Sequence, residues 1–469
     1  MTSKSHMPKL VTYQEVLKLA WPASVAASVT PLLGAVDVWA LAHSGRPLDI
    51  AAVGLGAIIF SLAYWTFGFF RMSVAGLTAQ ASGAGDLAQE RAALARGVAL
   101  SGGIGFLLLM FQWPIGAVTF PLLTIDTGAS AQTIDAAKDY YAVRILGAPF
   151  ALATYATFGF LTAKGRTDYL MIASLAITLL NAGLDYLFVV EFGWGARGVA
   201  LGTLIAEVFG FFFSAIFVIN TLRKDGSITK HWRDIDYFHL GEIRKTLSIN
   251  RDIFIRTLLL AFSFAWFVQR GSAFGDVTLA ANQVLLQLFL FTGLALDGTA
   301  IAAETLVGRA IGDRDKARGQ ARLRAAIKAT FAPALAAAIL FTGFYLFAGD
   351  AIIHLLTPEG DIRETSSAFL FWIIISPLIV VLGFQLDGIF IGATMAKQMR
   401  NGMIISVGIF VLATIWLGER YGNHGLWAAF SLFFVVRAAT LARDFPQLFD
   451  RAHLAPTASD TAENPSARR

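Results

Sequence analysis

Acidic side chains lie inside several long apolar stretches of the chain, where few charged residues are expected. Asp37 interrupts the apolar run 19–41, and Asp185 interrupts the run 169–190. Asn181 precedes Asp185 by one helical turn, so both side chains would lie on one face of a helix. Carboxylate and amide oxygens are ligands for hard cations, and a carboxyl group held away from water can instead carry a proton. These three residues are therefore candidates for binding a cation or a proton.

The second half of the chain has its own pair of candidates, Asp297 and Asp387, each followed by a glycine. An Asp at the centre of a membrane helix costs about 2.5 to 3.5 kcal/mol, so it needs a partner or a function. These two acids either contact a substrate or pair with an intramembrane arginine, for which the candidates are Arg71, Arg144 and Arg256. Glu207 and Glu304 lie closer to the ends of their apolar stretches, and we expect them to be structural.

Other chemistries lack the residues that they need. The chain has no cysteine, which excludes disulfides, thiolate metal sites and thiol nucleophiles. Its seven histidines lie in tails, loops or near the ends of apolar stretches, so we assign no catalytic residue and no metal ligand. The phosphate-binding pattern Gly-x-x-x-x-Gly-Lys-Ser/Thr is absent, which argues against ATP hydrolysis as the energy source. We expect a protein that is not an enzyme and needs no cofactor beyond a coupling ion, H⁺ or Na⁺.

The composition indicates which elements must position the candidate residues. Apolar residues make up 56% of the chain and charged residues only 15%, against roughly 25% in soluble domains. A hydrocarbon core about 30 Å thick requires roughly 20 mostly apolar residues per helix. Twelve such stretches occur, two of them shortened by Arg256 and Arg437: 19–41, 51–70, 97–125, 145–163, 169–190, 198–222, 257–269, 277–296, 329–349, 365–386, 401–418 and 425–436. The sequence therefore predicts an all-α membrane protein with twelve transmembrane helices.

The basic residues indicate how these helices cross the membrane. Most of the 37 Lys and Arg residues fall in alternate connections, above all in 223–251 and 309–328. By the positive-inside rule both termini then lie in the cytoplasm, and we expect a multi-pass protein of the inner (plasma) membrane. This distribution explains the formal charge of +5, so we expect the lipid bilayer and no nucleic acid as a partner.

A short repeat divides the chain into two halves. Gly85-Asp86 and Gly312-Asp313 lie 227 residues apart, and so do Gly195-Ala-Arg-Gly198 and Gly422-Asn-His-Gly425. Two matches at one offset predict two pseudo-symmetric six-helix bundles with the substrate path between them. We expect an N-terminal lobe at 1–222, a basic cytoplasmic linker at 223–250, a C-terminal lobe at 251–450 and a disordered cytoplasmic tail at 451–469.

Several short motifs, in their order along the twelve stretches, are similar to those of a known family. They are Trp21-Pro22, Val36-Asp37, Phe67-Gly-Phe-Phe-Arg-Met72, Asn181-Ala-Gly-Leu-Asp185, Leu279-Ala-Ala-Asn-Gln283, Leu296-Asp-Gly298 and Leu386-Asp-Gly-Ile-Phe390. Together they resemble the multidrug and toxic compound extrusion (MATE) transporters, and within them the DinF-like branch. The resemblance covers nearly the whole chain. It implies a V-shaped pair of six-helix lobes that exchanges cytosolic organic compounds for inward-moving protons or sodium ions.

The resemblance also implies a site. By resemblance to DinF-like members, the cation site of the N-terminal lobe would be formed by Asp37, Asn181 and Asp185, together with Thr203 from the sixth span. Other branches place cation-binding acids in the C-terminal lobe, one of them in the seventh span, where this chain has Arg256 and no internal acid. That difference favours a site in the N-terminal lobe.

The expected function is secondary active antiport by alternating access, in which a monomer exports small organic or xenobiotic compounds. One alternative is a flippase or exporter of lipid-linked saccharide with a related fold, which would need a basic cavity for a pyrophosphate. Another is an integral-membrane enzyme whose buried acids act in hydrolysis. The few, scattered intramembrane arginines argue against the first alternative, and the peripheral histidines argue against the second.

Overall fold

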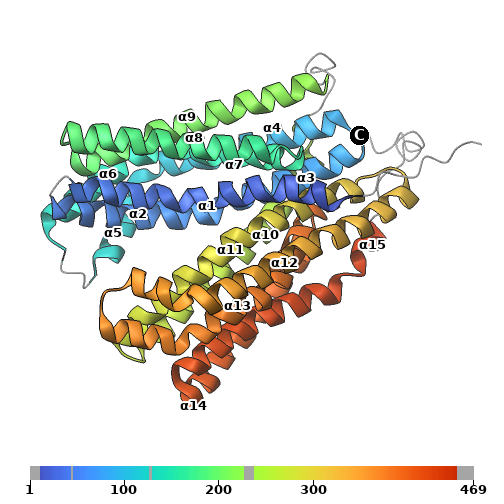
Figure 1. The fold of residues 1–469 in the computed structure, drawn as a ribbon. Helices are drawn as coiled ribbons and strands as arrows, with labels where there is room; N and C mark the ends of the chain where they lie inside the picture. Colours follow the sequence, from blue (N-terminus) through green and yellow to red (C-terminus); the bar gives the residue numbers. More distant parts are fainter. Residues whose placement is uncertain (1–10, 44–45, 126–128, 227–236, 452–469) are drawn as a thin grey trace, which may run out of the picture. The chain divides into compact units, whose positions relative to one another are not determined.

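The computed structural model describes residues 11–43, 46–125, 129–226 and 237–451, and these segments contain helices and no strand. Figure 1 labels the helices along the chain. Their bounds are α1 (Tyr13–His43), α2 (Pro47–Phe67), α3 (Phe69–Gly83), α4 (Leu87–Met110), α5 (Gln112–Thr124), α6 (Ala131–Arg144), η1 (Ile145–Gly147), α7 (Ala148–Ala163), α8 (Thr167–Asp185), η2 (Tyr186–Glu191), α9 (Gly195–Lys224), α10 (Leu240–Ser272), α11 (Asp276–Ile311), α12 (Lys316–Leu356), α13 (Gly360–Gly392), α14 (Ala396–Asp444) and α15 (Gln447–Arg451).

Within the described residues, eleven helical segments are long and apolar enough to cross a membrane. The last of them, α14, has 49 residues and contains Gly422, whose φ of 58° is not helical. At 1.5 Å per residue, α14 would be roughly 70 Å long, more than twice the thickness of the hydrocarbon core. It therefore supplies two crossings joined at Gly422, and the prediction of twelve transmembrane helices is confirmed. The helices of the seventh and twelfth predicted spans are α10 and the second part of α14. They continue past Arg256 and Arg437, as expected.

Many large apolar side chains on these helices face outward. Trp113 is 81% exposed, Phe347 89% and Leu355 85%. In water such residues would favour aggregation, whereas lipid chains solvate them. The exposed surface of the helices is therefore suited to a bilayer.

The contacts divide the chain into two compact units. One, here called the N-terminal unit, comprises Val25–Thr78 and Leu87–Arg244. The other, here called the C-terminal unit, comprises Met1–Ser24, Ala79–Asp86 and Lys245–Arg469. The lobe boundaries expected from the sequence stay a prediction. The expected tail and the middle of the basic linker lie outside the described residues, except that Arg451 ends α15.

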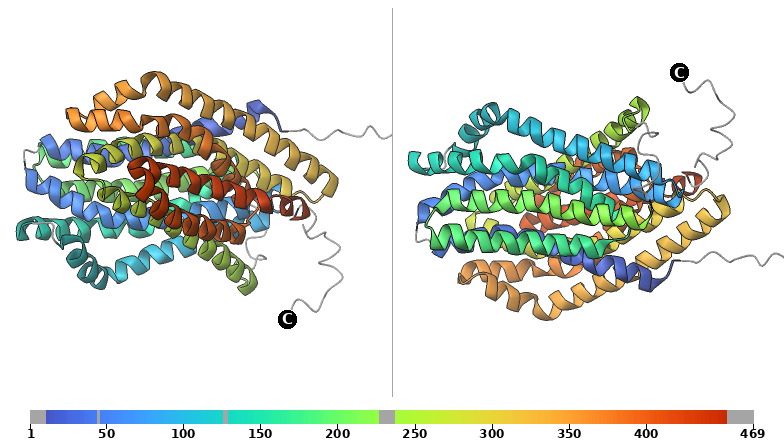
Figure 2. Two further views of the ribbon diagram at one scale, coloured as in Figure 1. Left: turned by 90° about the horizontal axis from the view of Figure 1, so that it is seen from below. Right: turned by 90° about the horizontal axis from the view of Figure 1, so that it is seen from above.

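In the N-terminal unit, α9 packs against α6, α7 and α8, while α4 packs on α7 and α2 on α6. Figure 2 shows these helices in two further views. The core between α2 and α6 contains Phe60 and Tyr140, whose rings meet edge to face. This packing places α8 and α9 beside each other along the segment that holds the candidate residues.

In the C-terminal unit, α11 packs against α12 and α13, and α13 packs against α12 and α14. Its core is rich in aromatic rings, with Phe267 and Trp427 in edge-to-face contact. Asn282 and Asn423 exchange hydrogen bonds of 2.7 and 2.9 Å, so the two buried amides satisfy each other.

The last turn of α3, which belongs to the same unit, lies unusually close to the last turn of α11. A Cβ atom added to Gly83 would overlap the carbonyl oxygen of Arg309, and one added to Gly312 would overlap that of Gln80. Gln80 also donates through Nε2 to the carbonyl oxygen of Gly392, at 2.9 Å. Only glycine allows this approach, because any other residue would place its Cβ inside a neighbouring backbone.

Candidate ion-binding site

Four of the candidate residues come together in the N-terminal unit. Asp37 comes from α1, Asn181 and Asp185 from α8, and Thr203 from α9. All four are buried, and Asn181 and Asp185 are fully inaccessible. The carboxyl groups of Asp37 and Asp185 lie close enough to share a proton. We call these four residues the acid cluster.

The acid cluster has more oxygen acceptors than donors. Asn181 donates through Nδ2 to Thr203 Oγ1 at 3.3 Å, and the Thr203 hydroxyl donates to the carbonyl oxygen of Val199 at 2.9 Å. Four buried oxygens have no hydrogen-bond donor: Asp37 Oδ1, Asn181 Oδ1, Asp185 Oδ1 and Asp185 Oδ2. Buried acceptors without donors are costly, so this group of oxygens is suited to a bound proton or metal cation.

Local irregularities of the helices shape this cluster. Asp185 is the last α-helical residue of α8, which continues as the π-helical turn η2. Such turns are frequent at functional sites, because they change the direction of the side chains around them. On the facing helix α9, a Cβ atom added to Gly202 would lie 2.6 Å from Asp185 Oδ1. Gly202 therefore allows α9 to approach the carboxylate, a role that nothing in the sequence around it indicated.

Arg144 lies beside the acid cluster. Its guanidinium interacts electrostatically with Asp37 and Asp185. Nη1 donates to the Tyr140 hydroxyl, while Nε lies 3.9 Å from Glu207 Oε1. This Nε is buried and has no hydrogen-bond partner, so the ion pair with Glu207 is loose. Arg144 is the last residue of α6, immediately before the 3₁₀ turn η1.

The expected position of Glu207 near the end of its helix is wrong, because this residue lies near the middle of α9; the expected structural role stays a prediction. Its carboxylate accepts a hydrogen bond from the Tyr64 hydroxyl at 3.4 Å. A Cβ atom added to Gly147 in η1 would overlap Glu207 Oε2. Glu207 is therefore packed against the break between α6 and α7. The sequence offered a signal for this position, because the predicted run 198–222 nearly coincides with α9 and already places Glu207 away from its ends.

The charges around the acid cluster do not balance. Asp37, Asp185 and Glu207 supply three carboxyl groups, and Arg144 supplies one positive charge. Where water is largely excluded, uncompensated charge is expensive. The arrangement is therefore suited to taking up small cations.

The acids of the C-terminal unit, in contrast, are compensated by arginines. Asp387 on α13 accepts hydrogen bonds at Oδ2 from Arg256 of α10 and Arg437 of α14. Asp297 on α11 interacts electrostatically with the same two arginines. Two acids and two bases thus form a group without net charge. In the sequence, Arg437 was only an interruption of the twelfth apolar run, and its partner could not be identified.

Arg71 and Glu304 are the remaining charged candidates. Arg71 is in the first turn of α3 and belongs to the N-terminal unit, so it is not in the unit that holds Asp297 and Asp387. Glu304 is buried within α11. Of the three arginines considered as partners for Asp387, the structure pairs it with Arg256.

Comparison with known proteins identifies the family. The MatE family model matches residues 22–187 and again residues 253–417, which together make up well over half of the chain. The chain belongs to the MatE family. The model matches once in each half, so the MATE resemblance and the duplicated organisation are confirmed, and the members of this family are transporters and not enzymes.

Individual relatives agree with this assignment. The chain is 34% identical to the DNA damage-inducible protein F of Escherichia coli over 90% of both chains, which confirms the DinF-like branch. It is 20% identical to the multidrug export protein MepA of Staphylococcus aureus, over 88% of this chain and 89% of that protein. The crystal structure of the Vibrio cholerae MATE transporter VcmN in the bent form has a TM-score of 0.80 at 16% identity, covering 95% of this chain and 98% of that one.

Together these findings establish a multi-pass membrane transporter of the multidrug and toxic compound efflux family. The all-α fold with two pseudo-symmetric six-helix bundles is confirmed.

Proposed function

We propose that this MatE-family transporter is a secondary active antiporter, which exports organic or xenobiotic compounds from the cytoplasm in exchange for H⁺ or Na⁺. The observation that carries the proposal is the acid cluster. Four buried oxygens without donors are contributed by Asp37, Asn181 and Asp185, in a unit where the carboxyl groups beside Arg144 outnumber its single charge. A cation that enters this cluster removes both the unsatisfied acceptors and the excess negative charge.

Coupling requires that the ion and the exported compound favour different conformations, because a ligand that binds both states equally shifts neither. The elements around the acid cluster include irregular turns at which the helices can change conformation. Asp185 adjoins the π-helical turn η2, and Arg144 adjoins the 3₁₀ turn η1. When an ion occupies the acid cluster, the charge that Arg144 faces changes. We propose that the strengths of its interactions with Glu207 and with the two aspartates change accordingly.

The group of Asp297, Asp387, Arg256 and Arg437 has a different role in this proposal. Its two acids are already neutralised by two arginines, so it does not need an external cation. We propose that the coupling ion binds in the N-terminal unit, and that the C-terminal group fixes helix positions or contacts the substrate. The protein would act as a monomer in the inner membrane with both termini in the cytoplasm, as the distribution of basic residues indicates.

The test is efflux from proteoliposomes that contain the purified chain. Asp37→Asn and Asp185→Asn each remove one ionisable carboxyl group with little change in volume, so we expect ion-driven export to fall to the background level. Asp135→Asn is the matched control, because the side chain of this acid is 73% exposed and lies outside the cluster. Size-exclusion chromatography of each purified variant in detergent would show that it is folded.

Separately imposed gradients of pH and of sodium identify the coupling ion in the same vesicles. We expect one of the two gradients to drive export by the wild type. Neither gradient should drive export by Asp37→Asn or Asp185→Asn, the two cluster variants. Full transport by both cluster variants would reject the assignment of the ion site. Equal loss in the Asp135→Asn control would show that the assay reports general damage.

A further inference from the structure

A polar cavity of about 430 Å³ lies in the C-terminal unit, apart from both charged groups described above. It is bordered by α10, by the start of α14 and by α15. Its lining includes four basic residues and one acid: Arg251, Lys397, Arg400, Arg451 and Asp252. Four positive charges and one negative charge leave a formal charge of +3, which favours an anionic ligand.

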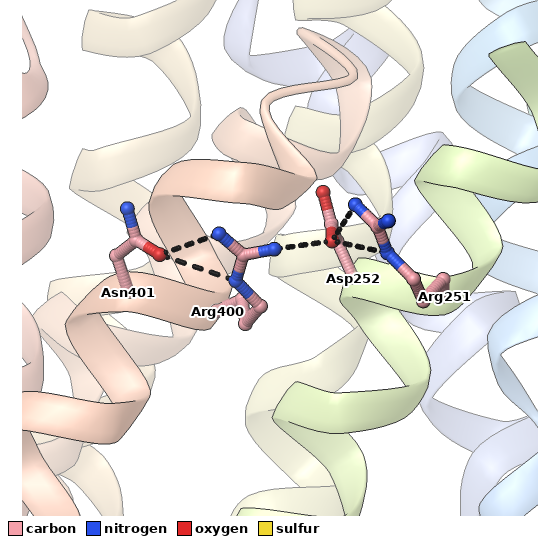
Figure 3. A network of polar contacts seen from close by, with 4 residues as sticks. All are labelled: Arg251, Asp252, Arg400 and Asn401. Atoms are coloured by element: carbon pink, nitrogen blue, oxygen red, sulfur yellow. Dashed lines mark hydrogen bonds and ion pairs between the residues drawn. The ribbon is translucent and has the colours of Figure 1, made fainter.

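Part of this charge is organised by a network that Figure 3 shows. Asp252 Oδ1 accepts from Arg400 Nη1 at 2.7 Å and from Arg251 Nη2 at 3.0 Å. Arg400 also donates through Nε and Nη2 to Asn401 Oδ1, at 3.1 and 2.8 Å. One buried carboxylate therefore holds two guanidinium groups in place without neutralising both of them.

Further donors surround the same cavity. Arg451 Nη1 donates to the carbonyl oxygens of Ala393 and Thr394, which holds α15 beside the start of α14. Lys397 is exposed and forms no ion pair within the described residues. The N-terminus of α14 has no side-chain cap on its first amide groups. Guanidinium, ammonium and free helix amides are the groups that bind phosphate in proteins.

An apolar surface begins next to this cavity. On α14, Ile404 follows Arg400 by one turn and is 50% exposed, and Leu412 two turns later is 69% exposed. Gly408 between them has open space around it, so a shallow strip runs along the helix. A charged cavity that opens onto an exposed apolar helix face matches the two ends of a phospholipid.

We propose that this cavity binds the phosphate of an anionic phospholipid, with an acyl chain along the strip from Ile404 to Leu412. The connections that form it belong to the side that the positive-inside rule assigns to the cytoplasm, where basic cavities between helices recognise anionic headgroups. A zwitterionic lipid fits less well, because its choline group would face four basic side chains. This site is independent of the proposed ion coupling.

The test counts the lipids retained by the full chain in neutral detergent. The chain is titrated with phosphatidylglycerol or with phosphatidylcholine, and the bound lipids are measured by native mass spectrometry. We expect phosphatidylglycerol to be retained at lower concentration. Lys397→Glu should weaken its binding about tenfold, because the change removes one favourable charge and adds a repulsive one. Lys316→Glu, at the exposed start of α12, is the matched control and should have little effect.

A second variant and a competitor complete the design. Arg400→Gln combined with Asp252→Asn removes a phosphate donor without leaving a buried carboxylate unpaired, and it should also weaken retention of phosphatidylglycerol. Millimolar inorganic phosphate should not displace the lipid. Displacement by inorganic phosphate would mean that the site takes a soluble phosphate, which overturns the lipid assignment. Equal retention of phosphatidylcholine, or equal weakening by Lys316→Glu, would overturn the proposal as well.

Discussion

At the scale of single residues, the charge of this protein is distributed unequally between two buried groups. Asp297 and Asp387 have two arginines as neighbours, whereas Asp37 and Asp185 share the single Arg144 with Glu207. Buried charge that is not fully compensated costs several kcal/mol, so a cation or proton would stabilise the second arrangement. This difference is the reason why we propose the acid cluster, and not the C-terminal group, as the site of the coupling ion.

Glu207 should tune how tightly the acid cluster holds its ion. In Glu207→Gln, Arg144 loses its ion-pair partner, so its positive charge acts more strongly on the two aspartates and competes with the bound ion. We expect the ion concentration for half-maximal export to rise about tenfold, which corresponds to roughly 1.4 kcal/mol. Glu191→Gln, an exposed acid at the end of η2, is the control. Identical ion dependence in the two variants would contradict this role for Glu207.

Asp313, in the connection between α11 and α12, predicts a pH dependence of stability. Burial raises the pKa of its carboxyl group, but hydrogen bonds from Arg318, Asp315 N–H and Arg322 outweigh burial and hold the pKa below its ordinary value of 3.8. The folded state therefore binds this proton less tightly than the unfolded state. The resulting stabilisation is fully present above the unfolded-state pKa and is lost as the pH falls through the lower folded-state value.

Asp313→Asn should accordingly lower the melting temperature in detergent at neutral pH. The difference from the wild type should shrink only below about pH 4, where the wild-type carboxyl group begins to be protonated. Asp315→Asn is a suitable comparison, because Asp315 caps α12 through its side chain and Asn is an equally good cap. If the difference in melting temperature between Asp313→Asn and the wild type stayed constant down to strongly acidic pH, the stabilisation by Asp313 would not be ionic.

At the scale of elements, the helices are interrupted where the charged residues gather. Asp185 is followed by η2, and Arg144 is followed by η1. The close approach of α3 to α11 is a third special feature, because it depends on Gly83 and Gly312. The way in which neighbouring helices pack depends on these positions. The apolar character of the helices alone does not determine it.

Gly312→Val should separate the last turns of α3 and α11, because the new side chain would overlap the carbonyl oxygen of Gln80. The absence of native cysteine allows a single reporter at Ala79, which is fully buried beside Gly308. We expect Ala79→Cys to react with a maleimide faster when Gly312→Val is present. Gly343→Val is the control, because nothing lies within 4 Å of its added Cβ. Equal reaction rates in both backgrounds would show that the two turns do not depend on this contact.

At the scale of the whole molecule, the repeat and the family agree. The MatE model matches once in each half, and the two halves each contain a six-helix bundle. The two bundles have nevertheless diverged in charge, since one has an acid cluster and the other has paired arginines. This divergence supports the proposal that the coupling ion binds in the N-terminal unit.

The orientation of the chain in the membrane is a separate prediction at this scale. The side chain of Lys138 in α6 is 54% exposed and is expected outside, whereas Lys316 of α12 is expected in the cytoplasm. In intact cells, a membrane-impermeant maleimide should therefore label Lys138→Cys, and it should label Lys316→Cys only after permeabilisation. The reverse pattern would place both termini outside.

The sequence by itself determined the membrane class, the twelve helices, the repeat and the two aspartates of the acid cluster. These features follow from local properties, because the length and polarity of a stretch decide whether it can cross a hydrocarbon core. The spacing of Asn181 and Asp185 along one helix is local in the same sense.

Only the tertiary structure decided which charges meet. Asp387 lies 131 residues from Arg256 and 50 from Arg437, and Arg144 lies on a different helix from Glu207. Such pairs depend on helix packing, on η1 and η2, and on glycines that permit close approach. A charge inside an apolar run shows that some partner is needed, but the partner is fixed by side-chain packing across helices, which no linear pattern contains.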